Sequence, residues 1–216
     1  MRIPDIGLGD LAVGKDLQSW ARVELEVPPS EPVELVLAVA DPAIAVISEE
    51  PTAVGAESII WSVNNSSSRV FYVQGLSRGA TTITASATGF NDSEATVTVT
   101  ESGFYISSPS FISTNTQSSP RTVRVQVAQL NADGALSSTN QPVRAGLSVE
   151  VPVSSADIDI GQITLSPLVF DVGGSSRVTQ FDPISAGNTS VSITQPAGFT
   201  APTNGNQSID AVVEEP

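Results

Sequence analysis

Residues 75–100 read GLSRGATTITASATGFNDSEATVTVT, and their hydrophobic pattern is that of a β-hairpin. Ile83 and Ala85 alternate with threonine and serine, and the closing ATVTVT run alternates valine with threonine. This period of two is typical of strands that bury one face. Gly89–Ser93, a run of turn-forming residues, lies between the two alternating segments. The stretch therefore predicts two strands joined by a turn.

A related stretch, PISAGNTSVSITQPAGF, occurs at residues 183–199. Aligning Gly79 with Gly187 places Ile83 on Val191, and a Gly-Phe pair then follows in both stretches, one residue out of step. Self-similarity at a fixed spacing indicates a repeated structural unit. The chain is predicted to contain two repeats, each about half of its length.

Short alternating segments also precede the hairpin. In Ala21–Val27 (ARVELEV) the apolar residues occupy every second position, and Val33–Ala40 continues with a more apolar run. Seven or eight such segments, at spacings of about 8 to 12 residues with turn chemistry between them, are typical of a β-sandwich. The sequence predicts an all-β fold of two tandem β-sandwich domains, residues 1–102 and 103–216.

The composition narrows the range of partners. The chain has 23 acidic and 9 basic residues, a net charge of −14, and 40% hydrophobic residues. This hydrophobic content predicts a folded chain, and the negative charge disfavours binding to nucleic acid and to anionic membrane surfaces. No apolar run reaches the roughly 18 residues of a membrane span. We expect no nucleic-acid partner and no membrane insertion.

The residues needed for common catalytic sites are scarce. The chain has no histidine, no cysteine, and a single lysine, Lys15. A Ser-His-Asp set cannot form, and a serine–lysine pair would have to use Lys15. Paired carboxylates remain for glycoside hydrolysis, but a small sandwich without long insertions offers no obvious cleft for them. The sequence predicts a protein that is not an enzyme and needs no organic cofactor.

Calcium is the one cofactor for which the sequence offers candidate ligands. Asp157 and Asp159 lie two residues apart, on one face of an expected strand, and Ca²⁺ prefers carboxylate oxygens. The alternative is a solvated strand face beside a turn, because the other positions of a calcium loop are absent. Glu101 and Asp182 at the domain junction form a second candidate cation site.

Several segments together resemble the bacterial Ig-like repeat modules that occur in tandem in large secreted and cell-surface proteins. They are VGKDLQ at 13–18, DPAIAVIS at 41–48, FYVQGL at 71–76, and Ala80–Phe90 with the TVTVT run after it. The resemblance covers the first repeat and is strongest in the second from Gly146 to Val213. It implies Ig-like sandwiches, an extracellular or cell-surface location, and a structural or adhesive role. It carries over no functional residues.

Two further groups of residues have competing interpretations. Lys15 is either a surface lysine in a turn or, as in some surface modules of this kind, one partner of an isopeptide bond. Trp20, Trp61 and Tyr72 would suit stacking against sugars, but core packing is the default expectation, above all for Trp61.

The leading hypothesis is a stalk, a spacer or the repeating unit of an extracellular fibre, whose partners are copies of itself or neighbouring Ig-like domains placed end to end. The alternative is an adhesin that recognises a glycan or a protein through loops such as Ser107–Pro120 or Asn64–Ser68. The sequence does not choose between them.

Overall fold

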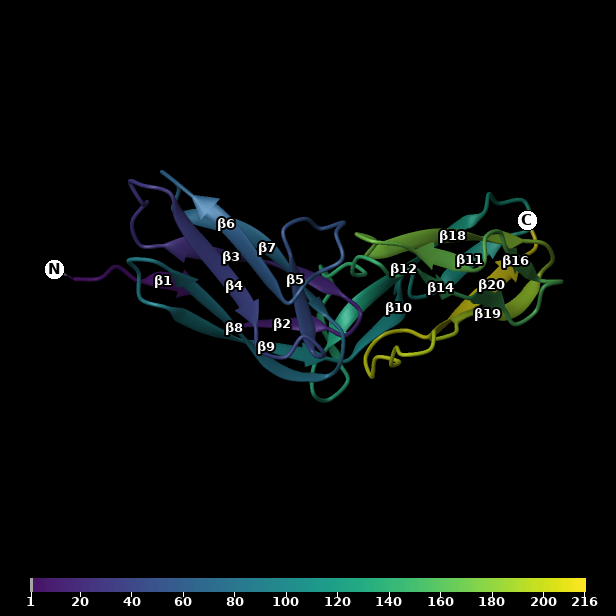
Figure 1. Ribbon diagram of the computed structural model, residues 1–216. Helices are drawn as coiled ribbons and strands as arrows, with labels where there is room; N and C mark the ends of the chain where they lie inside the picture. The colour runs from purple at the N-terminus through teal and green to yellow at the C-terminus, as the bar shows by residue number, and fades with distance from the viewer. Residues whose placement is uncertain (1) are drawn as a thin grey trace. The chain divides into compact units, whose positions relative to one another are not determined.

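In the computed structural model, which describes residues 2–216, the chain is all-β and the described residues form no helix (Figure 1). This confirms the predicted fold class. The chain divides into two compact units. Unit 1 is the chain up to Thr100 together with Arg144–Leu147, and unit 2 is Glu101–Val143 with Ser148–Pro216. Unit 1 is therefore discontinuous in sequence, because four residues from the second half of the chain belong to it.

The strands of unit 1 are β1 (Ile6–Leu8), β2 (Leu11–Gly14), β3 (Gln18–Leu25), β4 (Val33–Val39), β5 (Ala45–Ser48), β6 (Ser58–Val63), β7 (Ser68–Gly75), β8 (Gly79–Ala87) and β9 (Ser93–Thr100). They form one sheet of order β1-β3-β7-β5 and a second of order β2-β9-β8-β4-β6. The first order corresponds to strands A-B-E-D of an immunoglobulin sandwich, and β9-β8-β4 corresponds to G-F-C. Unit 1 is thus an Ig-like sandwich in which β2 runs parallel to β9.

The hairpin predicted from the sequence is β8 and β9. The two strands are antiparallel, with Ile83 opposite Ala95 and Thr82 opposite Thr96. Ile83 and Ala95 are buried, whereas Thr82 and Thr96 face away from the core, as the alternation requires. The hairpin therefore supplies one wall of the core, and Phe71 on β7 comes from the facing sheet.

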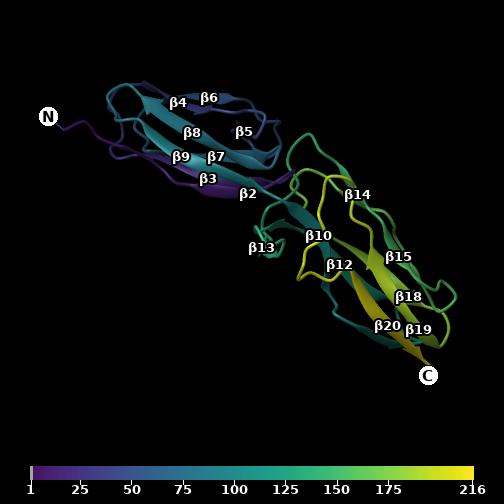
Figure 2. The same ribbon diagram turned by 90° about the horizontal axis from the view of Figure 1, so that it is seen from below.

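The strands of unit 2 are β10 (Ser102–Ser108), β11 (Ile112–Asn115), β12 (Arg121–Leu130), β13 (Leu136–Ser138), β14 (Val149–Val151), β15 (Val153–Ser155), β16 (Gly161–Ile163), β17 (Leu168–Phe170), β18 (Ser176–Pro183), β19 (Gly187–Ile193) and β20 (Ser208–Glu214). The sheet β10-β12-β18-β16 matches β1-β3-β7-β5, and β11-β20-β19-β15 matches the first four strands of the other sheet of unit 1. Figure 2 shows β19 and β20 side by side. A separate β14–β17 pair corresponds to β4–β6, and Pro152, which cannot donate a ladder hydrogen bond, separates β14 from β15.

The alignment of Gly79 with Gly187 is confirmed at atomic detail. Both glycines begin the strand that pairs with the last strand of their unit, with φ of 155° and 157°. A Cβ on Gly79 would lie 3.1 Å from Ile44 Cδ1, and one on Gly187 would lie 2.6 Å from Ile160 Cδ1. The same close approach of an isoleucine explains why glycine occupies the position in both units.

Candidate functional site

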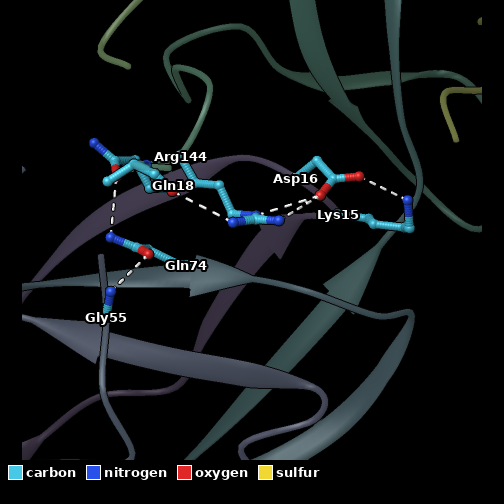
Figure 3. Close-up of polar contacts among 7 residues, drawn as sticks. Lys15, Asp16, Gln18, Gly55, Gln74 and Arg144 are labelled. Carbon is cyan, nitrogen blue, oxygen red and sulfur yellow. Dashed lines mark hydrogen bonds and ion pairs between the residues drawn. The ribbon is translucent and has the colours of Figure 1, made fainter. Parts of the chain in front are cut away.

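A group of connected polar contacts in unit 1 surrounds the turn between β2 and β3 (Figure 3). The Lys15 amide donates to the Thr100 carbonyl at 2.8 Å, and the Asp16 amide donates to the Gly75 carbonyl at 2.9 Å. Asp16 has φ of 63°, a left-handed conformation that aspartate adopts more readily than most residues. The turn thereby holds the Asp16 carboxylate in a fixed position beneath the end of the sandwich core.

The Asp16 carboxylate binds two cationic side chains. Its Oδ2 lies 2.7 Å from Lys15 Nζ, and its Oδ1 accepts hydrogen bonds from Arg144 Nη2 at 3.2 Å and Nε at 3.3 Å (Figure 3). The Arg144 amide also donates to the Asp16 carbonyl at 3.1 Å. Because the carboxylate is only 14% exposed, these pairs are less screened by water than surface ion pairs are.

Two buried glutamines continue the polar group. Gln74 Nε2 donates to the Ala53 carbonyl at 2.7 Å, and its Oε1 accepts from the Gly55 amide at 3.0 Å. Gln18 Nε2 donates to the Pro51 carbonyl at 2.8 Å, and its Oε1 accepts from the Ala145 amide at 3.3 Å. Both amides therefore satisfy backbone groups of the loop between β5 and β6, and Gln18 also holds the segment that begins at Arg144.

This arrangement stabilises loops and has no evident chemistry. Its side chains are engaged with other groups of the protein. Its one hydroxyl, that of Ser48, accepts from Gln74 Nε2 at 3.3 Å and donates to the Glu50 carbonyl at 2.8 Å, so its partners are an amide and a carbonyl rather than a base. Within residues 2–216, no cluster of three or more acidic side chains is placed to hold a metal ion. The sequence analysis missed the site because Gln18, Gln74 and Arg144 have no local pattern that marks them as partners.

The calcium candidates Asp157 and Asp159 lie in the loop between β15 and β16, so the expectation that they share a strand face was wrong. Unit 1 has an equivalent loop at Asp41–Ala43. Asp157 Oδ1 accepts a hydrogen bond from the Asp159 amide at 3.0 Å, as Asp41 Oδ1 does from the Ala43 amide at 3.0 Å. The Asp157 amide in turn donates to Thr189 Oγ1. The structure thus gives Asp157 a role as the acceptor of an Asx turn, while calcium binding by Asp157 and Asp159 stays a prediction.

Glu101 and Asp182, the second candidate cation site, do not lie together in the structure. Glu101 directly precedes β10, whose Ser102 pairs with Gln129 near one end of β12. Asp182 follows Phe181, which pairs with Arg121 at the other end of β12. At about 3.3 Å per residue, the two carboxylates lie about 30 Å apart along that strand. They cannot share a cation.

The aromatic candidates are more exposed than side chains packed in a core would be. Trp20 on β3 is 64% exposed and lies opposite Tyr72 of β7. Trp61 is half-buried, and its Nε1 donates to Glu49 Oε2 at 2.7 Å. Core packing was wrong for Trp20, which lies on the outer face of β3. Trp61 lies on the same face of β6 as the buried Ile59 and Val63, but β6 is the edge strand of its sheet and leaves this side chain half-buried.

Lys15, the candidate for an isopeptide bond, is half-buried against Asp16. Its sequence neighbour Asp16 is thus the ion-pair partner of its ammonium group, and the isopeptide hypothesis gains no support from this geometry. Among the described residues, no helix is both long and apolar enough to cross a membrane.

Comparison with known proteins did not assign the chain to a family. No protein-family model matches the chain, and neither does any curated protein. Domains 5–6 of the S-layer protein SbsC are 15% identical over 99% of this chain and 97% of that chain, with a TM-score of 0.37. The D0-D1 domain of Intimin is 14% identical over 96% of this chain and 97% of that one, with a TM-score of 0.32. Likenesses this distant carry no conclusion, so the Ig-like assignment rests on the strand order.

Proposed function

We propose that the chain is a non-catalytic structural module of a bacterial extracellular surface protein, in which tandem Ig-like units serve as a stalk or spacer. The observation that carries the proposal is the parallel pairing, in each unit, of the second strand with the last. In unit 1, β2 pairs in parallel with β9 from Leu11–Val97 to Gly14–Thr100. In unit 2, β11 pairs in parallel with β20 from Ile112–Ala211 to Asn115–Glu214.

A parallel ladder between β2 and β9 suits a unit that is pulled from its two ends. Tension toward the N-terminus reaches β2 through β1, which pairs with β3, and tension toward the C-terminus acts on β9, so the two forces load the β2–β9 ladder in opposite directions. All of the ladder hydrogen bonds then have to break together, whereas a ladder pulled apart from one end loses them one at a time. Since each bond contributes about 0.5–1.5 kcal/mol, simultaneous rupture needs a larger force.

The loops support the same role. The Asp16 ion pairs and the amides of Gln18 and Gln74 fasten the β2–β3 turn and the loop between β5 and β6 to the body of unit 1. Neighbouring Ig-like domains, joined end to end, are the proposed partners, and a fibre built from such units is the extended form of this proposal. An adhesin is the second candidate, favoured by one surface hollow in unit 2 that is described below.

Single-molecule force spectroscopy tests the proposal. The chain has no cysteine, so introduced cysteines are unique attachment points. Handles at the two chain ends shear the β2–β9 ladder, and handles at Gly9→Cys and Glu94→Cys unzip it from one end. We expect unit 1, recognised by a gain of about 3.4 Å of contour length per residue, to unfold at a clearly higher force in the first geometry.

The Gly9 position accepts a cysteine because a Cβ there has no neighbour within 4 Å. Glu94 is exposed on β9, so its replacement leaves the core unchanged. Equal unfolding forces in the two geometries would show that the parallel ladder does not resist tension, and the stalk proposal would lose its main support.

A further inference from the structure

A hollow of about 440 Å³ opens on the outer face of unit 2, over β19 and β20 and beside the start of β11. It is lined by Phe111, Ala156, Asn188, Thr189, Ser190, Asp210, Ala211 and Val212. This volume is in the range of about 300–1,000 Å³ that is common for small-molecule sites. The loop Ser107–Pro120, singled out in the sequence, supplies Phe111.

Unit 1 has the same hollow, which provides an internal comparison. It is lined by Ala40, Asp41, Ala80, Thr81, Thr82 and Thr96. The equivalence is set by hydrogen bonds: the Ala40 amide donates to the Thr82 carbonyl at 3.0 Å, and the Ala156 amide donates to the Ser190 carbonyl at 2.9 Å. Strand register agrees, since Thr82 lies opposite Thr96 and Ser190 lies opposite Asp210.

The two hollows differ in the side chains that face solvent. Where unit 1 has Ala80, Thr82 and Thr96, the matching positions of unit 2 are Asn188, Ser190 and Asp210. The scaffold is thus the same in both units, while at these three positions only unit 2 has an amide and a carboxylate. The carboxylate that lines the unit 1 hollow belongs to Asp41, at a different position, and its Oδ1 accepts a hydrogen bond from the Ala43 amide.

The strand next to the hollow differs as well. Leu11 pairs with Val97 in unit 1 and Ile112 pairs with Ala211 in unit 2, so the preceding residues Asp10 and Phe111 are equivalent. Asp10 Oδ1 is used locally, accepting a hydrogen bond from the Thr96 amide at 2.7 Å. Phe111 instead presents an aromatic ring that is 49% exposed.

The polar groups of the unit 2 hollow are available to a ligand. Within residues 2–216, no hydrogen bond or ion pair engages the side chains of Asn188, Ser190 or Asp210. Asp210 and Ser190 are direct cross-strand partners, and Asn188 lies two residues along from Ser190 on the same face of β19. A hydroxyl, an amide and a carboxylate therefore line one side of the hollow that Phe111 borders.

We propose that this hollow, bordered by Phe111 and lined by Asn188, Ser190 and Asp210, is a binding site for a neutral saccharide. The apolar C–H face of a pyranose packs on the electron-rich face of an aromatic ring. Its hydroxyls need both donors and acceptors, which an amide and a hydroxyl supply, and the carboxylate accepts from two of them. Asp210 and the net charge of −14 disfavour an anionic sugar.

A second hollow, which shares Phe111 with the first, extends the site. It is lined by Pro109, Phe111, Ile112, Ser113, Arg121 and Thr122. The Phe111 ring thus borders two adjacent depressions, an arrangement that suits more than one sugar ring. The proposal goes beyond the structural role, and it fails or succeeds independently of the force measurement.

The test is a titration of the full chain with neutral hexasaccharides of glucose (α- and β-linked), mannose and N-acetylglucosamine, followed by amide NMR shifts. An oligogalacturonate serves as the anionic probe. We expect one of the neutral oligosaccharides to shift the amides of Asn188, Ser190 and Asp210, and to leave those of Thr82 and Thr96 unchanged.

Variants locate the binding energy. Phe111→Ala and the isosteric Asp210→Asn should each weaken binding by about tenfold or more. Trp20→Ala removes a more exposed aromatic side chain outside the site and should leave the affinity unchanged. Unaltered far-UV circular dichroism shows that each variant is folded.

Three results would overturn the proposal. The first is no shift with any neutral oligosaccharide at about 10 mM, a concentration that detects even millimolar affinity. The others are equal shifts in the hollows of both units, or binding of the oligogalacturonate alone. Loss of binding in Trp20→Ala that equals the loss in Phe111→Ala would place the site elsewhere and would also refute it.

Discussion

The ion pairs of Asp16 give a prediction that the structure makes quantitative. Asp16 is 14% exposed and Arg144 is 21% exposed, so neither charge is fully hydrated. In Asp16→Ala, Arg144 loses the carboxylate that binds its guanidinium, and Lys15 loses its ion pair with Asp16. Removing one partner of a buried pair costs about 3–5 kcal/mol, and partial exposure places this variant near the lower end, at about 3 kcal/mol.

Arg144→Ala should cost less, because Lys15 still neutralises Asp16 at 2.7 Å. The loss is then that of hydrogen bonds to a charged group, about 1.5–2 kcal/mol. Asp16→Gly separates charge from backbone conformation. At φ of 63° alanine adds about 1 kcal/mol of strain that glycine avoids, so Asp16→Gly should be milder than Asp16→Ala by that amount.

The assay is urea unfolding followed by tryptophan fluorescence. The only two tryptophans, Trp20 and Trp61, both belong to unit 1, so the signal reports the unfolding of that unit. We expect a loss of stability in the order Asp16→Ala, then Asp16→Gly, then Arg144→Ala. If Arg144→Ala costs as much as Asp16→Ala, Lys15 does not compensate for the missing guanidinium, and the charge reasoning is wrong.

Three further predictions concern the second unit. Gly103→Ala should destabilise unit 2 by about 3 kcal/mol in chemical denaturation followed by circular dichroism, because the new Cβ overlaps the Thr200 carbonyl oxygen, whereas Gly9→Ala, which has open space, should change nothing measurable. Burial raises the pKa of the Tyr105 phenol above its usual value of about 10. Its contribution to stability is complete below that value and is lost as the pH rises through the folded-state pKa, so Tyr105→Phe should flatten the alkaline fall in thermal stability. Asp157→Ala should cost about 1 kcal/mol and Asp157→Asn almost nothing, since the amide oxygen still accepts the loop hydrogen bond; stabilisation of the native chain by added Ca²⁺ that Asp157→Asn abolishes would instead establish the calcium site.

Much of the fold follows from local patterns in the sequence. The period of two in residues 79–87 and 93–100 corresponds to β8 and β9, whose buried and exposed faces follow the alternation. The repeat was visible because the same close approach of an isoleucine, Ile44 or Ile160, requires glycine at Gly79 and Gly187. Such constraints act on neighbouring residues or on identical motifs, so they leave a trace in one sequence.

The candidate sites depended on contacts between residues far apart in the chain. Arg144 is 128 residues from Asp16, and nothing near either residue marks the other as its partner. The hollow of unit 2 brings Phe111 next to Asp210 through parallel pairing of β11 with β20, a pairing that alternation does not encode. The same limit explains Glu101 and Asp182, which were grouped by their supposed place at a junction and lie at opposite ends of β12.

The sequence by itself therefore determined most of the strands, the repeat and the acidic, histidine-free chemistry, because hydrophobic period, turn residues and charge are properties of short segments and of composition. The tertiary structure alone decided which strands are neighbours, that Arg144–Leu147 belongs to unit 1, and which polar side chains remain free beside Phe111. Those features depend on strand register and on the packing of distant segments, in which a shift of one residue would turn every side chain to the opposite face.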